Sequence, residues 1–324
     1  MADTTRQNRA TTLVAVWPGM GQVASTAGYY LMSRLGMEEA PPIAAADLFD
    51  VEHVEIRDGL VRKADAPQGR LFLRKNPGEG ADVAVFIGES QPPSGSNVAF
   101  CKRLLDAAEA LGVRDVYTFA AMVSEMLPSS PSRVVGVATD ESGLADLKRR
   151  DITILDTGRI TGLNGVFLAE AAGRGMRGIG LLGEVPALAA QIPYPKASRT
   201  VLETFAALAG IEVDLEALVR YERRIDRQLT GLVTQIQQAM QPKVMEDPEE
   251  EDLTPDEPGG DAGAEVEGES RAGISDTDRA RIDDLFGQAR TDPSKSFELK
   301  QELDRLGVFK DYEDRFLDLF RKAG

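Results

Sequence analysis

The order of predicted strands and helices constrains the fold of this chain more than any other feature. Short runs rich in Val, Ile and Leu, typical of buried strands, alternate with stretches that have helical spacing. The strands are expected at 13–17, 83–87, 116–121, 134–138 and 179–182, and the helices at 22–35, 96–111, 143–150, 164–174 and 196–209. This alternation predicts a three-layer α/β fold, in which a largely parallel sheet carries helices on both faces. A turn signal at 57–60, Arg-Asp-Gly-Leu, indicates a hairpin and therefore an antiparallel part.

The C-terminal third adds a long helix, a linker and a small all-helical tail. Asp214 is a suitable N-cap for a helix that reaches about Met240, whose apolar face is expected to pack on the body or on a neighbouring subunit. Arginines at 220, 223, 224 and 227 alternate with acids there and predict a solvated or salt-bridged face. Residues 243–273 are rich in Glu, Asp, Pro and Gly, which predicts a disordered acidic linker. Three short helices follow within 274–324, beginning with a capping-box pattern at Ser275 and Asp278.

The counts of cysteine and histidine exclude several kinds of site. Cys101 is the only cysteine and His53 the only histidine among 324 residues. An intrachain disulfide, a cysteine-based metal site and a multi-histidine metal site are therefore impossible, and we expect no metal. Cys101 lies beside Phe100 in an expected helix, which favours a buried thiol, and His53 in its extended segment is interpreted as an edge or surface residue.

The charge of the chain is concentrated in one segment. The formal net charge is −16, and twelve acidic residues between 245 and 270 account for all but four of these charges. A nearly neutral body without a Lys/Arg-rich stripe lacks the electrostatic footprint of a nucleic-acid-binding protein. No secretory h-region or 18-residue apolar run occurs, so we expect a soluble cytoplasmic protein with no membrane or nucleic-acid partner.

A glycine-rich turn follows the first predicted strand. Residues 19–24, Gly-Met-Gly-Gln-Val-Ala, match the G-x-G-x-x-A pattern, so that Gly19 and Gly21 could bring backbone N–H groups close to a phosphate. The alternative is a tight strand-to-helix turn packed against the sheet, which uses the same conformational freedom of glycine. We favour this alternative because Pro18 stands at the strand end and Asp47 comes late for a ribose-binding acid.

Three more turns of this kind follow predicted strands, at 88–93, 158–165 and 183–186. In a parallel sheet such turns gather at the carboxyl edge, where α/β proteins bind ligands. The candidate ligand-binding residues are Gly19, Gly21, Gly88, Glu89, Thr161, Gly162, Asn164, Gly165 and Glu184. The alternative is that the glycines only shape turns and the two Glu residues are solvated or cap helices. No spacing indicates a nucleophile with its base, so no residue is predicted to be catalytic.

Three motifs and a C-terminal pattern together resemble a known family. The segments 17–24, Trp-Pro-Gly-Met-Gly-Gln-Val-Ala, 160–165, Ile-Thr-Gly-Leu-Asn-Gly, and 181–186, Leu-Leu-Gly-Glu-Val-Pro, occur in the order typical of the archaeal and bacterial branch of the proteasome assembly chaperone two family. The segment 193–197, Pro-Tyr-Pro-Lys-Ala, and the run 210–215 are similar to the family's usual ending. The likeness covers roughly residues 11–242. We therefore expect a disordered N-terminus at 1–10, an α/β domain at 11–242, the acidic linker at 243–273 and the helical tail at 274–324.

The resemblance implies a single nucleoside-phosphorylase-like α/β domain, an oligomer, and a protein partner. Some relatives carry a label of ATP-dependent ligase, but this sequence shows no ATP-grasp pattern, so we expect no cofactor. The first hypothesis is a non-catalytic homo-oligomeric scaffold or chaperone-like protein that binds another protein. Phe316, Leu319 and Phe320 on the last helix could bind in a partner's groove, or could close the tail bundle. The second hypothesis is an enzyme or sensor with a nucleotide-like ligand at the glycine turns.

Overall fold

The protein is built around one large β-sheet. The computed structural model describes residues 11–50, 54–57, 59–63, 65–76, 81–240 and 274–321. His53, the N-terminal segment 1–10 and the expected linker 243–273 therefore lie outside the described residues. The strands are β1 (Thr11–Val16), β2 (Glu38–Glu39), β3 (Val54–Arg57), β4 (Leu60–Lys63), β5 (Gly69–Arg74), β6 (Asp82–Gly88), β7 (Val113–Ser124), β8 (Val134–Ala138), β9 (Thr153–Ile154) and β10 (Arg177–Pro186).

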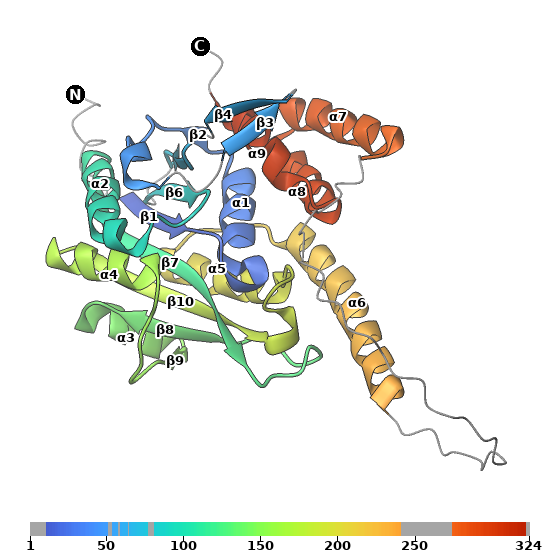
Figure 1. Cartoon of the computed structure of the whole chain (residues 1–324). Coiled ribbons are helices and arrows are strands. Elements are labelled where there is room, and N and C mark those ends of the chain that lie inside the picture. Colours follow the sequence, from blue (N-terminus) through green and yellow to red (C-terminus); the bar gives the residue numbers. More distant parts are fainter. Residues whose placement is uncertain are drawn as a thin grey trace, which may run out of the picture.

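Eight strands form the main sheet in the order β2-β5-β6-β1-β7-β10-β8-β9 (Figure 1). The pairs β1–β6, β1–β7, β7–β10 and β8–β9 are parallel, whereas β2–β5, β5–β6 and β8–β10 are antiparallel. Every residue of β1 is buried, as expected for a central parallel strand that is covered on both faces. The mostly parallel α/β fold predicted from the sequence is confirmed.

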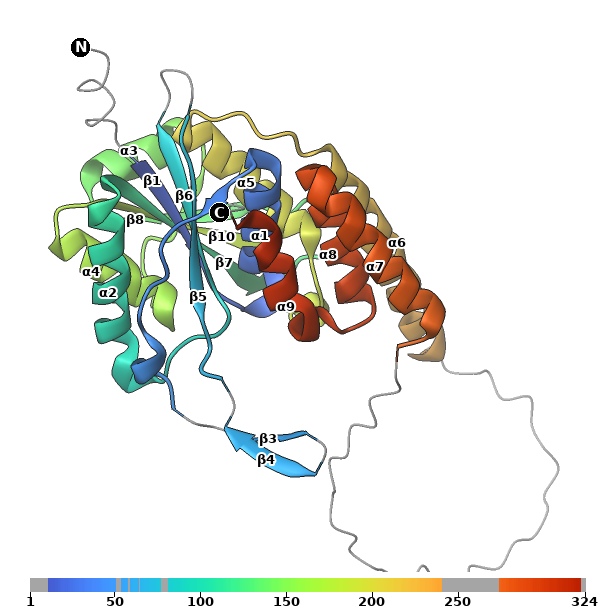
Figure 2. The ribbon, with the colours of Figure 1, turned by 90° about the horizontal axis from the view of Figure 1, so that it is seen from above.

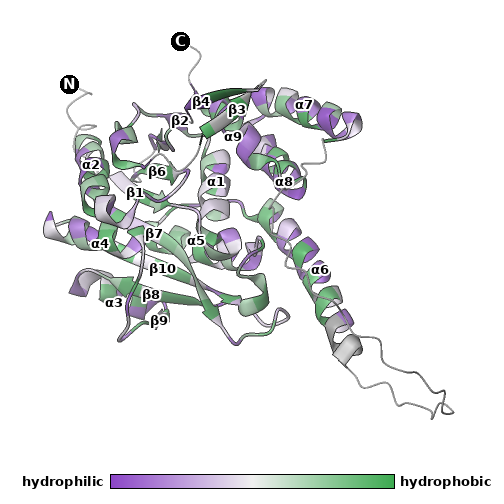
Figure 3. Cartoon of the chain, in the orientation of Figure 1, coloured by the Kyte–Doolittle hydropathy of each residue, from purple (hydrophilic) through white to green (hydrophobic). Residues whose placement is uncertain are grey.

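Helices cover both faces of this sheet. The α-helices are α1 (Val23–Leu35), α2 (Asn97–Ala110), α3 (Glu141–Arg149), α4 (Leu163–Gly173), α5 (Pro195–Ala209), α6 (Glu216–Met240), α7 (Asp276–Thr291), α8 (Ser296–Arg305) and α9 (Phe309–Leu317). Helices α1 and α5 pack together on one face and α2 and α4 on the other. Figure 3 shows hydrophobic residues concentrated in the central strands between these layers. Cys101 of α2 is fully buried in the second layer, and this burial raises the pKa of its thiol to about 12.

Short 3-10 helices connect several of these elements. They are η1 (Met20–Gln22), η2 (Ala46–Leu48), η3 (Ser94–Ser96), η4 (Ala187–Ala189), η5 (Pro293–Lys295) and η6 (Asp318–Phe320). Ser275 is the N-cap that the sequence pattern indicated, because its Oγ accepts a hydrogen bond from the Asp278 N–H at 3.1 Å. Asp292 caps the next turn in the same way, with Oδ1 3.0 Å from the Ser294 nitrogen.

The tail helices α7, α8 and α9 pack on the body beside α1. Figure 2, a view from above, shows them next to α1 and on the same side of the sheet. Tyr30 of α1 meets Phe297 of α8 edge-on, with ring centroids 4.5 Å apart, and Tyr29 meets Phe309 and Phe316 of α9 at 5.1 and 5.6 Å. Edge-to-face pairs at these distances add to the stability that burial itself provides.

Two elements project from this assembly. The hairpin β3–β4 extends away from the body (Figure 2), and its turn lies where the Asp-Gly signal predicted it. It forms a sheet of its own rather than an antiparallel part of the main sheet. Helix α6 begins against α5, and its outer half extends beyond the body (Figure 1). Leu218 and Leu229 on its apolar face are buried, but Leu232 is exposed.

Candidate functional site

The glycine turn after β1 is pinned by the polypeptide itself. Gly21 has φ of +60°, a conformation that favours glycine. Its N–H donates to the Ala190 carbonyl at 2.7 Å, and its carbonyl accepts from the Tyr194 N–H at 2.8 Å. The Gln22 N–H donates to the Gly19 carbonyl. Two N–H groups that a bound phosphate would need are therefore already used, which supports the interpretation of this motif as a structural turn.

Gly88, the last residue of β6, lies against the side chain of Trp17. A Cβ atom at this position would lie 2.4 Å from Cδ1 of Trp17, so only glycine fits beside the indole. Trp17 is buried against Phe86 and Phe167, and its Nε1 has no hydrogen-bond partner in the described part of the chain. The close packing of Trp17 on Gly88 holds the ends of β1 and β6 together.

Gln91 links three of the predicted turns. Its Oε1 accepts a hydrogen bond from the Leu163 N–H at 3.1 Å, at the first residue of α4, and its Nε2 donates to the Pro18 carbonyl at 3.4 Å. Gly162, with φ of +74°, leaves room for this contact, because a Cβ there would lie 2.9 Å from Gln91 Oε1. The structure thus brings the turns at Gly19, Gly88 and Gly162 to one edge of the sheet. Sequence reasoning did not identify Gln91.

The remaining residues of the 158–165 turn surround the start of α4. Thr161 and Gly162 are exposed. A Cβ on Gly165 would lie 2.6 Å from the Ile160 carbonyl oxygen, so glycine is required by the tightness of the turn. The Asn164 side-chain Oδ1 is buried without a hydrogen-bond partner among the described residues.

The two candidate carboxylates do not meet. Strands β6 and β10 are separated by β1 and β7, which corresponds to three strand spacings, or about 14 Å. Glu184 is buried on β10, where it accepts hydrogen bonds from Arg133 Nε and Nη2 at 2.8 and 3.1 Å. Glu89 Oε2 accepts from the Gln68 N–H at 2.8 Å, and burial raises the pKa of this carboxyl. Each carboxylate has a local partner, and the two form no general acid–base pair.

A small cavity lies at the carboxyl ends of β1 and β6, under the tail. It measures about 270 Å³ and is lined by Pro18, Gly19, Gln22, Ser25, Tyr29 and Gly88 of the body and by Lys300, Asp304, Phe309, Lys310 and Glu313 of the tail. The Tyr29 hydroxyl donates to Glu313 Oε1 at 2.5 Å. Lys310 Nζ donates to Glu313 Oε2 at 2.7 Å and to the Glu89 carbonyl at 3.1 Å. No sequence pattern marks the residues that make these tail contacts, so the sequence analysis did not identify them.

The α/β core matches a known protein family. A family model described as the PAC2 family matches residues 13–233. The chain belongs to the PAC2 family. The resemblance to the proteasome assembly chaperone two family, predicted from the three motifs, is thereby confirmed. An uncharacterised protein of Methanocaldococcus jannaschii is 30% identical over 243 residues, which are 74% of this chain and 90% of that protein.

Solved structures of PAC2-like proteins have the same fold. The Pyrococcus furiosus protein PbaB, described as an archaeal proteasome activator, is 22% identical with a TM-score of 0.57 over 69% of this chain and 93% of its own. The proteasome-assembly chaperone homologue Rv2125 of Mycobacterium tuberculosis is 23% identical, with a TM-score of 0.59 over 68% and 94%. A PAC2 family protein from Streptomyces avermitilis is 25% identical, with a TM-score of 0.59 over 71% and 100%.

The tail lies outside the PAC2 match and is docked on the PAC2 core. Phe316 and Phe320 are buried and Leu319 is partly buried. Phe316 packs on Tyr29, and Phe320 packs on Phe72 of β5 with ring centroids 6.1 Å apart. The structure therefore directs these candidate protein-binding residues toward the chain's own body. Their docking in a partner's groove stays a prediction that requires the tail to leave this site.

An ionic contact also secures the last helical turns. Arg70 of β5 is buried, and its Nη2 and Nη1 lie 2.6 and 3.1 Å from carboxylate oxygens of Asp314 and Asp318. The exposed carboxylates thus anchor the end of α9 and the turn after it to β5, the strand next to the edge strand β2. Within the part of the chain that the structure describes, no cluster of three or more His, Cys, Asp or Glu is arranged to hold a metal ion. None of the described helices combines the length and apolar content that crossing a membrane requires.

Proposed function

We propose that this chain is a non-catalytic, homo-oligomeric protein-binding scaffold of the chaperone type that acts in the cytoplasm. Its PAC2 family membership supports this role, as do structural neighbours described as a proteasome activator and a proteasome-assembly chaperone homologue. A proteasome subunit is therefore the first partner to test. The polar residues of the glycine-turn edge hold turns and helix starts, as Gln91 and Glu184 do, which agrees with a role without catalysis.

The observation that carries the proposal is the apolar surface of the projecting hairpin. Val54, Ile56, Leu60 and Val61 are between 52% and 71% exposed. Ile56 and Val61 are cross-strand partners, and Val54 lies two residues before Ile56, so these three share one face. A two-stranded hairpin is marginally stable alone, and exposed apolar side chains clustered on it are typical of a protein-binding surface.

A capture experiment with a matched control tests this proposal. Immobilised full-length protein is incubated with the proteasome α-subunits of the source organism, and the bound fraction is compared for wild type, Ile56→Lys and Val98→Lys. Val98 is also an exposed aliphatic residue, but it lies on α2, away from the hairpin. We expect binding by wild type and Val98→Lys and a loss of at least tenfold in Ile56→Lys. Equal binding by all three, or by none, would overturn the proposal.

A second candidate function is the binding of a small nucleotide-like ligand at the carboxyl edge. The cavity of about 270 Å³ beside Gly19 and Gly88 favours it, because α/β sheets bind ligands at this place. Native mass spectrometry of the purified chain, together with melting curves in nucleotides, tests this candidate. A retained metabolite or a stabilisation of several degrees would support it. A bare mass with unchanged melting temperatures would exclude it.

A further inference from the structure

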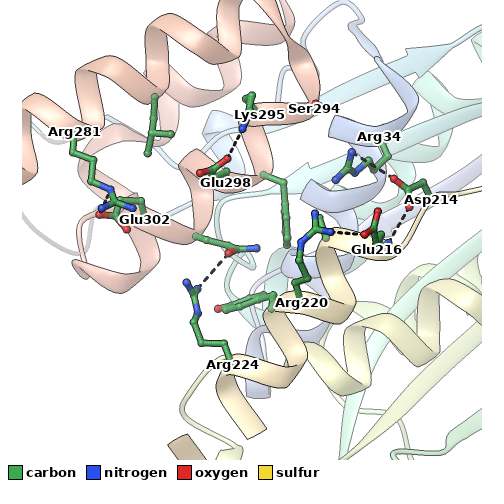
Figure 4. Close-up of a pocket in the computed structure, with 15 residues that line it drawn as sticks. Arg34, Asp214, Glu216, Arg220, Arg224, Arg281, Ser294, Lys295, Glu298 and Glu302 are labelled. Carbon is green, nitrogen blue, oxygen red and sulfur yellow. Dashed lines mark hydrogen bonds and ion pairs between the residues drawn. The ribbon is translucent and has the colours of Figure 1, made fainter. Parts of the chain in front are cut away.

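A second and larger cleft separates the body from the tail. It encloses about 480 Å³ between α1, the first turns of α6, and the tail elements α7, η5 and α8 (Figure 4). Five cationic side chains and four carboxylates line it: Arg34, Arg220, Arg224, Arg281 and Lys295, with Asp214, Glu216, Glu298 and Glu302. The cationic side chains on the walls therefore outnumber the carboxylates by one. A volume of about 480 Å³ is within the range of small-molecule sites.

Three of the cations are already neutralised at the walls. Each lies within 3.0 Å of a carboxylate that also lines the cleft: Arg220 with Glu216, Arg281 with Glu302, and Lys295 with Glu298. Their partners are on the same helix or within the tail, so these pairs do not need a ligand. Arg34 and Arg224 remain, with Asp214 as the one further carboxylate among the lining residues. Outside the lining, hydrogen bonds from Ser294 lower the pKa of the Asp292 carboxyl, and the charge of Arg34 adds to this shift.

Arg34 has a buried donor without a partner among the described residues. Its side chain is only 17% exposed, and its Nε is buried with no hydrogen-bond partner in the described residues. Asp214 Oδ2 lies 3.8 Å from Nη1, beyond hydrogen-bond distance, and the Asp214 side chain is itself largely exposed. The guanidinium carbon lies 5.3 Å from the centre of the Tyr30 ring. A buried guanidinium N–H without a partner is costly, and an anion in the cleft would relieve that cost.

Arg224 faces the cleft from α6. It has no carboxylate partner among the residues that the structure describes. Its Nη2 donates a long hydrogen bond of 3.3 Å to the Gln301 side chain, and its guanidinium stacks 5.0 Å from the centre of the Tyr221 ring. The sequence pattern predicted a solvated or salt-bridged arginine here. The Arg220–Glu216 ion pair agrees with that expectation. The Arg224 guanidinium lies over the Tyr221 ring, and within the described residues its side chain has one hydrogen-bond partner, Gln301.

We propose that this cleft binds a small polyanion with linked phosphate groups. Figure 4 shows Arg220 between Arg34 and Arg224, so a ligand that satisfies the outer two guanidiniums must extend across the cleft. Arginine is suited to phosphate because its planar fork donates two parallel hydrogen bonds. The rings of Tyr221 and Phe297, 6.1 Å apart, form an apolar wall beside this path. Such a ligand contacts body and tail together and fastens the tail to the body.

Calorimetric titration of the full-length protein tests the proposal. The probe is inorganic tripolyphosphate in metal-free buffer at fixed ionic strength, with orthophosphate as the shorter comparison. Variants are Arg34→Gln, Arg224→Gln and the control Arg223→Gln, which removes the same charge from an exposed neighbour on α6 outside the cleft. Melting curves establish that each variant is folded. Arg224→Gln is decisive because this half-buried residue has no ion pair to lose among the described residues.

We expect tripolyphosphate to bind at least tenfold more tightly than orthophosphate. Arg224→Gln should weaken tripolyphosphate binding tenfold or more, Arg34→Gln similarly, and Arg223→Gln less than twofold. Absence of binding at millimolar tripolyphosphate would overturn the proposal. So would equal losses in Arg223→Gln and Arg224→Gln, because the anion would then respond to the general charge of α6 rather than to the cleft.

Discussion

The hydroxyl of Tyr29 donates a hydrogen bond of 2.5 Å to Glu313 Oε1, and this contact joins the first helix of the core to the last helix of the tail, 284 residues later. Both residues are buried. Lys310 pairs with the second oxygen of the same carboxylate at 2.7 Å. Tyr29, Glu313 and Lys310 thus form a hydrogen-bonded network within a contact that is otherwise aromatic. Because hydrogen bonds are directional, this network fixes the orientation of α9 on α1 in addition to the stability that apolar burial provides.

Replacing Tyr29 with Phe should loosen the tail without disrupting the core. The substitution keeps the ring that packs on Phe309 and Phe316 and removes only the donor to Glu313. We expect a loss of about 1.5 to 3 kcal/mol in tail docking, the value of a hydrogen bond to a charged group. Amide hydrogen exchange of α8 and α9 measures it. Tyr312→Phe is the control, because its hydroxyl makes no hydrogen bond within the described chain, and equal exchange in the two variants would contradict the expectation.

The same contact predicts a dependence on alkaline pH. Burial, reinforced by the negative charge of Glu313, raises the pKa of Tyr29 well above its ordinary value near 10. The folded state therefore binds this proton more tightly than the unfolded chain does. Its contribution to stability is complete below pH 10 and is lost as the pH rises from there toward the folded pKa.

Urea unfolding at pH 8 and at pH 11 measures this effect. The wild type should lose more stability between the two values than Tyr29→Phe does, since other alkaline titrations are common to both proteins. A loss of the same size in the two proteins would show that the Tyr29 proton is not linked to folding.

Local signals were sufficient to predict most elements of the core. The strand at 134–138 has the same bounds in the structure, and the capping pattern at Ser275 begins α7. These features depend on residues within a few positions of one another. The hairpin turn at Gly59 is another example, although the hairpin forms a sheet of its own.

Long-range placement could not be predicted in the same way. Strand order separates Glu89 from Glu184, and strand order depends on crossover connections that residue spacing does not encode. The docking of Phe316 on Tyr29 and the position of Lys300 over the Tyr29 ring arise from tertiary packing across most of the chain. The hydrogen bond from Arg224 to Gln301, 77 residues later in the chain, illustrates the same limit.

Two glycines in helices should respond in opposite ways to substitution by alanine. A Cβ on Gly28 of α1 would lie 2.6 Å from Cγ2 of Val16, a fully buried residue of the central strand. Gly28→Ala should cost about 1 to 3 kcal/mol through overpacking. Gly231 of α6 has nothing within 4 Å of its Cβ position, so Gly231→Ala should stabilise by about 0.5 to 1 kcal/mol. Urea unfolding of both variants checks the signs, and stabilisation by Gly28→Ala would refute the close contact.

Self-association should depend on the outer half of α6. Leu218 and Leu229 are covered by the body, but Leu232, one turn further along the same face, is 45% exposed where the helix leaves the body. We expect a second copy to cover this face, because Leu232 continues the apolar stripe that the body buries up to Leu229. Leu232→Asp should therefore shift the protein toward monomer.

Thr234→Asp is the control for this prediction. It introduces the same charge at an exposed position on the opposite side of the helix and should leave the oligomer unchanged. Light scattering coupled to size exclusion, over micromolar concentrations, distinguishes the two variants, and a monomeric wild type over that range would show that α6 does not mediate assembly.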